Sequence, residues 1–186
     1  LKQLPTGAKR ILKIALFGPE STGKTTLAKQ LAEYYKTDWV PEFARDYLQE
    51  KWDKSKAICD VNDMLPIAYG QTQLENEKMA TANQYLFCDT NLMVTKVFSE
   101  VYYNYCDPLL DQAAREHEYD LFFLTDIDVP WEKDDLRDKP DGRETIFSVF
   151  KQSLIDNNKP FITISGTKKA RLEKAIQIVD DLARAK

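Results

Sequence analysis

The sequence predicts one α/β domain built on a parallel β-sheet, and three observations support this prediction. The chain has 186 residues, the length of a single domain, and 43% of them are hydrophobic, enough for a packed core. Five short apolar runs alternate with stretches of helical periodicity, which is typical of parallel strands covered on both faces. A glycine-rich phosphate motif directly follows the first run. We therefore expect residues 1–186 to form one domain.

The first half of the chain shows this alternation clearly. Ile11–Phe17 is almost continuously apolar, as expected of a strand buried on both faces. After the glycines, apolar residues recur at helical spacing over residues 27–35. A weaker strand at 38–41 leads into a helical stretch, and Asn62 or Asp63 is expected to cap the long helix that follows.

The second half repeats the pattern around a charged segment. Tyr85–Cys88 is a strand that ends on Asp89, and Leu121–Leu124 is the most apolar run, expected at the centre of the sheet. Residues 126–144 are densely charged and contain two prolines and a glycine, which predicts a mobile loop. The remaining expected elements are helices at about 92–105, 144–155 and 172–183 and a strand at 161–164.

Composition excludes several classes of protein. The net charge of −4 argues against a protein that coats duplex nucleic acid, because neutralising phosphates requires a clustered basic surface. No apolar stretch approaches the ~20 residues needed to span a bilayer. The cysteines are odd in number and form no C-x-x-C pair, so we expect a reduced, cytoplasmic protein without a disulfide framework. They are Cys59, Cys88 and Cys106.

The strongest functional signal is a phosphate-binding motif. Residues 18–25, GPESTGKT, match G-x-x-x-x-G-K-[ST] at every fixed position, between an apolar strand and an amphipathic helix. In such a loop the backbone N–H groups and the helix N-terminus face phosphate oxygens. Lys24 is expected to contact the β- and γ-phosphates of ATP, and the Thr25 hydroxyl to bind Mg²⁺. The expected nucleotide-binding residues are Gly18, Glu20, Ser21, Thr22, Gly23, Lys24, Thr25 and Thr26.

Asp89 is the candidate for the second metal residue. It closes a strand, and a carboxylate at the carboxyl end of a strand lies where ligands bind in open α/β sheets. The alternative is that Asp89 caps the following helix, with Thr90 and Asn91 as competing caps.

The charged loop at 126–144 is a candidate lid. Arg137, Lys139 and Arg143 could close over the γ-phosphate, where they would stabilise the charge that develops in transfer while water is excluded. Arg137 is the first choice for a catalytic arginine and Arg143 for a further nucleotide contact. The alternative is a solvated loop whose acids pair locally with these bases.

The acceptor side is expected after the second strand. Glu42 follows that strand, and Arg45 and Asp46 come one helical turn later on nearly the same face. One carboxylate could accept a proton from an attacking hydroxyl, and the other could hold a ribose diol. The alternative is that these acids simply favour the positive end of a helix dipole.

Four segments, FGPESTGKTTLA, VPEFARDYL, FCDTNLMVT and DIDVPWEKDDLRD, resemble the ribosylnicotinamide kinase domain of NadR-like proteins of NAD salvage. The resemblance extends from about Arg10 to Ala183. It implies a P-loop kinase fold with sheet order 2-3-1-4-5, helices on both faces and a lid. It also implies transfer of the γ-phosphate of ATP to the 5′-hydroxyl of nicotinamide riboside, a small-molecule substrate, with Mg²⁺ as cofactor.

The resemblance further implies roles for individual residues. Glu42, Arg45 and Asp46 would face the riboside, Asp89 the metal, and Arg137 the phosphates. Trp131 could lie against the nicotinamide or the sugar, or could anchor the lid. Gln71 could hydrogen-bond the base, although an exposed helical glutamine is the simpler interpretation.

Longer members of the family also carry an adenylyltransferase domain that depends on an H-x-G-H motif. The single histidine, His117, cannot supply this motif and is expected to be an exposed residue at a helix end, so that activity would lie outside this chain.

Two other functions stay open from the sequence. One is a kinase of another nucleoside or small metabolite, and the other is a regulatory module that binds ATP without turnover.

Overall fold

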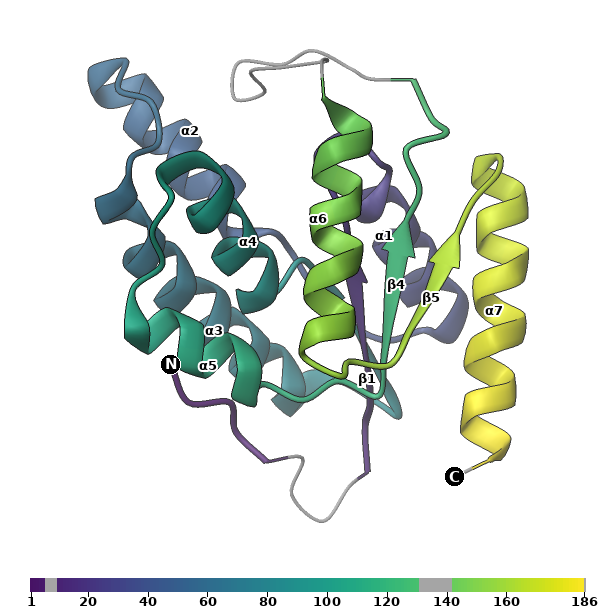
Figure 1. Cartoon of the computed structure of the whole chain (residues 1–186). Helices are drawn as coiled ribbons and strands as arrows, with labels where there is room; N and C mark the ends of the chain where they lie inside the picture. The colour runs from purple at the N-terminus through teal and green to yellow at the C-terminus, as the bar shows by residue number, and fades with distance from the viewer. Residues whose placement is uncertain (6–9, 131–141, 186) are drawn as a thin grey trace.

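The computed structural model describes residues 1–5, 10–130 and 142–185 (Figure 1). Its centre is a five-stranded sheet of order β2-β3-β1-β4-β5 in which every neighbouring pair is parallel, and this confirms the predicted fold and strand order. The strands are β1 (Leu12–Phe17), β2 (Trp39–Val40), β3 (Tyr85–Asp89), β4 (Leu121–Thr125) and β5 (Phe161–Ile164). The helical elements are α1 (Lys24–Tyr35), α2 (Phe43–Ser55), the 3-10 turn η1 (Val61–Asp63), α3 (Met64–Thr81), α4 (Leu92–Tyr103), α5 (Pro108–Glu116), α6 (Arg143–Asp156) and α7 (Lys168–Arg184).

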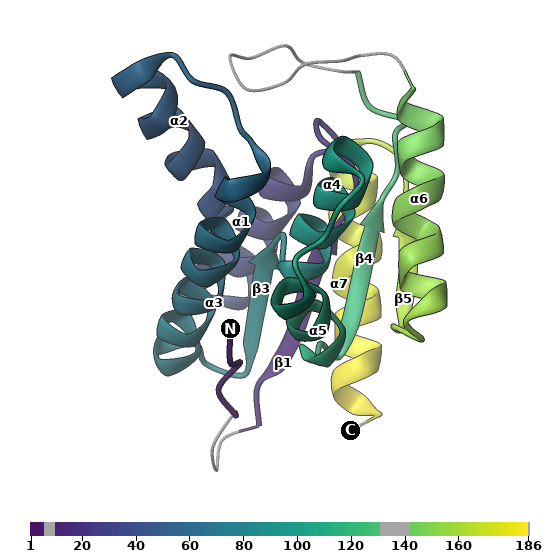
Figure 2. The same ribbon diagram turned by 60° about the vertical axis from the view of Figure 1, so that its left-hand side comes forward.

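Helices cover both faces of the sheet because successive side chains of each strand point to opposite sides. Ala15 and Phe17 of β1 belong to the core cluster that includes residues of α3, α4, α5 and α6. Ile14 and Leu16 belong to the cluster formed with α1 and α7. Figure 2 shows these two layers on either side of the strands. All of β1 is buried, as its continuous apolar sequence predicts.

Helix α2 differs from the others in its attachment. It extends outward above α3 at the edge of the molecule (Figures 1 and 2). None of its residues, all of which are described, is fully buried. Among the described residues, no helix is both long enough and apolar enough to cross a membrane.

Four details of the structure differ from the predicted elements. Helix α5 was not predicted, although Asp107 caps its first turn and proline occupies the first helical position, a common signature of a helix start. Asp63 occupies the N-cap position of α3, as predicted, but its side chain makes no capping hydrogen bond to that helix; the side-chain cap lies one turn earlier, at η1, where the Asp60 carboxylate accepts the Asn62 N–H at 2.8 Å. His117 does end a helix, but it is buried instead of exposed, and its Nε2 lies 2.9 Å from the Leu1 carbonyl oxygen.

The fourth difference concerns Arg143. The sequence placed it in the charged loop, whereas it is the first residue of α6. Gly142 precedes it in a left-handed conformation with φ of 82°, which ends the loop and starts the helix.

Candidate active site

The phosphate loop, residues 18–25, connects β1 to α1 at the carboxyl end of the sheet. Its two glycines have backbone angles that favour glycine, with φ of 139° at Gly18 and 82° at Gly23. A Cβ atom on Gly18 would lie 2.8 Å from the Thr125 hydroxyl oxygen, so β4 presses directly against this turn. The motif glycines are therefore required by local geometry as well as by phosphate access.

Lys24 is the first residue of α1, and its ammonium group curls back into the loop. Its Nζ donates to the carbonyl oxygens of Gly18 at 3.0 Å and Pro19 at 2.6 Å. The side chain is only 7% exposed. The ammonium group is thus held at the loop, within reach of a phosphate placed there.

Thr22 contributes to the loop in a different way from the other motif residues. Its hydroxyl donates to the Pro19 carbonyl oxygen at 2.8 Å and lies 2.7 Å from the Thr125 hydroxyl. Because the side chain is buried in these contacts, any phosphate contact of Thr22 would come from its backbone N–H.

Asp89 and Thr25 meet below the phosphate loop. The Thr25 hydroxyl donates to Asp89 Oδ2 at 2.5 Å, and Asp89 is fully buried at the end of β3. Its other oxygen, Oδ1, has no hydrogen-bond partner among the described residues. Burial, followed by the negative charge of Glu42, raises the pKa of Asp89 to about 6.

This pair fits a magnesium ion. A buried carboxylate oxygen without a partner, beside a hydroxyl, supplies the hard oxygen ligands that Mg²⁺ prefers. Among the described residues no group of three or more acidic, histidine or cysteine side chains is arranged to hold a metal ion by itself. The helix cap is supplied instead by Asn91, whose side chain accepts the Val94 N–H, so Asp89 is not the cap of α4.

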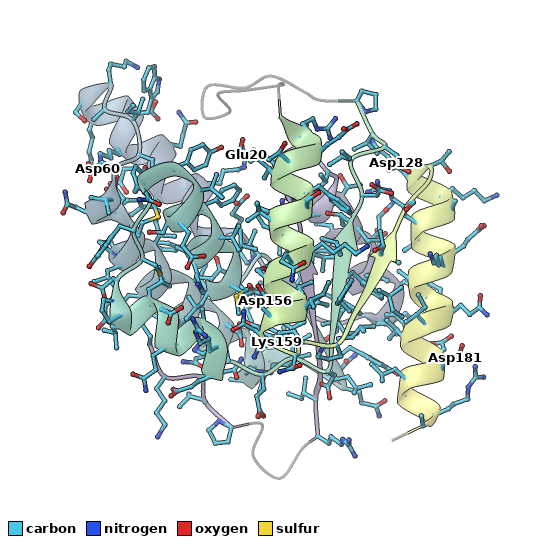
Figure 3. The ribbon with its side chains drawn as sticks, in the orientation of Figure 1. Glu20, Asp60, Asp128, Asp156, Lys159 and Asp181 are labelled. Atoms are coloured by element: carbon cyan, nitrogen blue, oxygen red, sulfur yellow. The ribbon has the colours of Figure 1, made fainter. Side chains whose placement is uncertain are left out.

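A cavity of about 640 Å³ lies against the phosphate loop. Loops that follow β4 and β5 form its other wall, at the upper end of the sheet where Figure 3 labels Glu20 and Asp128. Glu42 and Arg45 line it on the side of α2. The expected nucleotide-binding residues that line it are Glu20, Ser21, Thr22, Gly23, Lys24, Thr25 and Thr26.

Arg171 of α7 is a site residue that sequence reasoning missed. Its buried guanidinium donates to the carbonyl oxygens of Thr22 at 2.6 Å, Gly166 at 2.9 Å and Asp126 at 2.9 Å, and to the Asp128 carboxylate. It therefore ties the phosphate loop to the loops after β4 and β5. The available signal was its position: Arg171 lies one turn before Ala175 in the buried stripe of an amphipathic helix.

A second cavity, of about 300 Å³, adjoins the first and shares Leu48 and the two glutamates Glu20 and Glu42 with it. Apolar and aromatic side chains of α2, α3 and α4 form most of its wall. Among the described residues that line it, the only charged ones are these two glutamates. The full lining is Glu20, Glu42, Ala44, Leu48, Trp52, Ala57, Ile58, Cys59, Met64, Ile67, Gln71, Thr90, Val94, Thr95, Phe98, Tyr102 and Tyr103.

The predicted acceptor residues divide between these cavities and the surface. Glu42 lines both cavities, and Arg45, which pairs with it at 3.8 Å, lines the first. Asp46 is exposed and is not among the described residues that line either cavity, so its position does not support a role in holding the ribose. Gln71 lines the second cavity and is buried, so the expectation of an exposed glutamine is wrong.

Of the predicted lid residues, the structure describes Arg143. Trp131, Arg137 and Lys139 lie outside the described residues, and their predicted roles stay predictions. Arg143 is described, and its guanidinium donates to the carbonyl oxygens of Val129 at 2.9 Å and Ser21 at 3.4 Å. It thus contacts the backbone of the phosphate loop from the start of α6.

A parallel sheet of order 2-3-1-4-5, with a phosphate loop after β1 and an aspartate at the end of β3, defines a P-loop kinase fold. A family model described as an AAA domain (AAA_28) matches residues 13–171, and the chain belongs to this family of nucleotide-binding domains.

Two curated relatives place the chain near NadR. It is 26% identical over 184 residues to the trifunctional NAD biosynthesis/regulator protein NadR of Salmonella typhimurium, covering 96% of this chain and 45% of that protein. It is 28% identical over 165 residues to the NadR protein of Escherichia coli K12, covering 87% and 40%. The predicted resemblance to a NadR-like kinase domain is confirmed, and the chain spans less than half the length of these relatives.

Solved structures share the fold. A NadR protein in complex with NAD and AMP-PNP aligns with a TM-score of 0.76 at 20% identity, covering 95% of this chain and 50% of that one. A NadR protein in complex with NR aligns with a TM-score of 0.73 at 19% identity, covering 92% and 51%. Thymidylate kinase from Ehrlichia chaffeensis aligns with a TM-score of 0.63 at 16% identity, covering 92% and 99%.

Proposed function

We propose that this protein is a kinase that transfers the γ-phosphate of ATP to the 5′-hydroxyl of nicotinamide riboside. The observation that supports this most directly is the pair of adjoining cavities. The larger is built around the phosphate loop, the smaller is largely apolar, and Glu42 lines both. A donor nucleotide in the first and a nucleoside in the second would meet at this carboxylate.

The proposed reaction assigns a task to each residue at the junction. Glu42 accepts the proton of the attacking hydroxyl, because it lines both cavities and, of the two glutamates that do so, it is the one whose charge acts on Asp89. Lys24 and the loop N–H groups stabilise negative charge on the phosphoryl group as the bond to ADP breaks. Thr25 and Asp89 would hold Mg²⁺, which would supply positive charge to offset the negative charge of the phosphates.

The charge of the acceptor cavity favours a cationic nucleoside. The N-glycosidic bond of nicotinamide riboside leaves a permanent positive charge on the pyridinium ring. The described charged residues lining this cavity, Glu20 and Glu42, are both acidic, and Trp52, Phe98 and Tyr103 present aromatic rings nearby. Carboxylates and aromatic faces both attract a desolvated cation, by amounts on the order of 1–2 kcal/mol for a single ring contact.

Two ligands of the same shape but different charge test this proposal. Nicotinamide riboside is compared with its 1,4-dihydro form, in which the ring is neutral, using ATP and Mg²⁺ and scoring the 5′-phosphate by mass spectrometry. We expect kcat/KM to be about 10-fold or more higher for the cation, the equivalent of at least about 1.4 kcal/mol. Adenosine and cytidine serve as neutral controls. Equal or better turnover of a neutral nucleoside would contradict the assignment of nicotinamide riboside.

A further inference from the structure

Gly70 and Gln71 occupy neighbouring positions in α3, and both contact the short segment that carries Glu42. We propose that these two residues are positioning residues that clamp Pro41–Phe43 and thereby place the Glu42 carboxylate between the two cavities. The inference rests on the proposed function, because that function is what makes Glu42 the proton acceptor.

Gln71 holds the segment on both sides of Glu42. Its Oε1 accepts the Phe43 N–H at 2.9 Å, and its Nε2 donates to the Pro41 carbonyl oxygen at 3.3 Å. The Thr90 hydroxyl, next to Asp89, lies 3.5 Å from the same Oε1. The side chain is only 2% exposed, so its polar atoms depend on these protein partners rather than on water.

These contacts replace an ordinary helix cap. Phe43 is the first residue of α2, and an N–H at that position has no acceptor within its own helix. Glu42 occupies the capping position, yet its side chain makes no capping hydrogen bond within the described part of the chain. Gln71 therefore caps α2 from a different helix, and this leaves the Glu42 carboxylate available to the cavities.

Gly70 fixes the same segment by close packing. A Cβ atom at this position would lie 2.2 Å from Cε1 and Cζ of Phe43 and 2.4 Å from its Cδ1. The Phe43 ring thus lies directly on the α3 backbone, where any larger residue would displace it. Glycine within a helix costs roughly 0.5–1 kcal/mol relative to alanine, and here the close approach of the ring accounts for its presence.

The clamp matters because it acts at the end of α2 that adjoins Glu42. Tyr47 and Lys51 also attach the helix, by hydrogen bonds to Asp63 one to two turns further along. At the first turn, the contacts of Phe43 with α3 set where the helix begins. A shift of the helix start moves the neighbouring Glu42. Misplacing a reacting group by about 1 Å can cost on the order of 100-fold in rate.

A steric exchange tests the role of Gly70. The Gly70→Ala variant is expected to lower kcat on nicotinamide riboside by about 10- to 100-fold, with the KM for ATP within about twofold of wild type. Adding Phe43→Val removes the ring atoms that the new methyl group meets, so the double variant should recover at least about tenfold in kcat. Because Phe43→Val by itself weakens packing, recovery of kcat in the double variant could not come from a general gain in stability. Wild-type kcat in Gly70→Ala, or no recovery in the double variant, would overturn the proposal.

Hydrogen exchange tests the Gln71 contact without reference to any substrate. In Gln71→Met the Phe43 amide should exchange at least about tenfold faster, while amides in the middle of α3 keep their protection and show that the fold is intact. The matched control is Gln73→Leu, on the exposed side of the same helix, which should change neither Phe43 exchange nor kcat. Unchanged exchange at Phe43 in Gln71→Met rules out the clamp. If exchange responds as expected but wild-type protein does not phosphorylate nicotinamide riboside, the clamp stands and the proposed function fails.

Discussion

Replacing Asp89 with asparagine is expected to change how folding stability depends on pH. The wild-type carboxyl group is fully buried, with one oxygen bonded to Thr25 and the other without a partner among the described residues. Burial and the nearby charge of Glu42 raise its pKa from 3.8 to about 6. Between these two values the folded protein holds a proton that the unfolded chain has released, so stability falls as the pH rises.

The size of the effect follows from the pKa values. A rise from 3.8 to about 6 corresponds to roughly 3 kcal/mol of folding free energy, lost as the pH passes through that interval and constant above it. The asparagine side chain does not titrate, so the variant lacks this component. The stability of Asp89→Asn relative to wild type should therefore improve by roughly 2 kcal/mol between about pH 4 and about pH 7, because part of the change falls below pH 4.

Urea unfolding of both proteins at about pH 4 and about pH 7, without nucleotide or Mg²⁺, measures this difference. Subtracting the wild-type free energy of unfolding from that of the variant removes the contribution of the other carboxyl groups. Comparing this difference at two pH values removes any effect of the new amide that does not depend on pH. The same variant should turn over much more slowly and require more Mg²⁺. A stability difference that is the same at both pH values would refute the electrostatic description of Asp89.

Four other substitutions separate the parts of the site. Lys24→Ala should reduce kcat by about 30- to 1,000-fold, or roughly 2–4 kcal/mol, with an unchanged circular dichroism spectrum, and full turnover would contradict its role. Glu42→Gln should lower kcat by about 100-fold or more with little change in the KM for riboside. Asp46→Asn, at an exposed position, should behave like wild type. A loss of kcat in Asp46→Asn with wild-type kinetics in Glu42→Gln would exchange their roles. Arg171→Met should raise the KM for ATP and lower the free energy of unfolding by roughly 2–4 kcal/mol in urea titrations, and wild-type values of both would show that its contacts are dispensable.

The parts of the structure that depend on local sequence were predictable. The order of strands and helices follows from apolar runs and helical periodicity, and the phosphate loop follows from a motif whose glycines are required by backbone geometry at Gly18 and Gly23. The buried contact between Thr25 and Asp89 was predictable too, because parallel strands bring their carboxyl ends to one edge of the sheet.

Residues whose role depends on distant partners could not be placed from sequence. Arg171 reaches the phosphate loop across the molecule, and Gln71 caps a helix that begins far away in the sequence. His117 is buried because the N-terminal segment lies against it, which no local pattern indicates. Helix α5 is different, because the aspartate and proline at its start are a local signal for a helix.

The central claim is tested most directly by following the phosphate itself. Protein is incubated with ATP labelled at the γ-phosphate, Mg²⁺ and nicotinamide riboside, and the products are separated. The proposed function predicts that label appears in nicotinamide mononucleotide in equal amount to the ADP formed, and that both depend on the riboside and disappear in Lys24→Ala. ADP release that does not depend on the riboside, or label recovered only as inorganic phosphate, would contradict it.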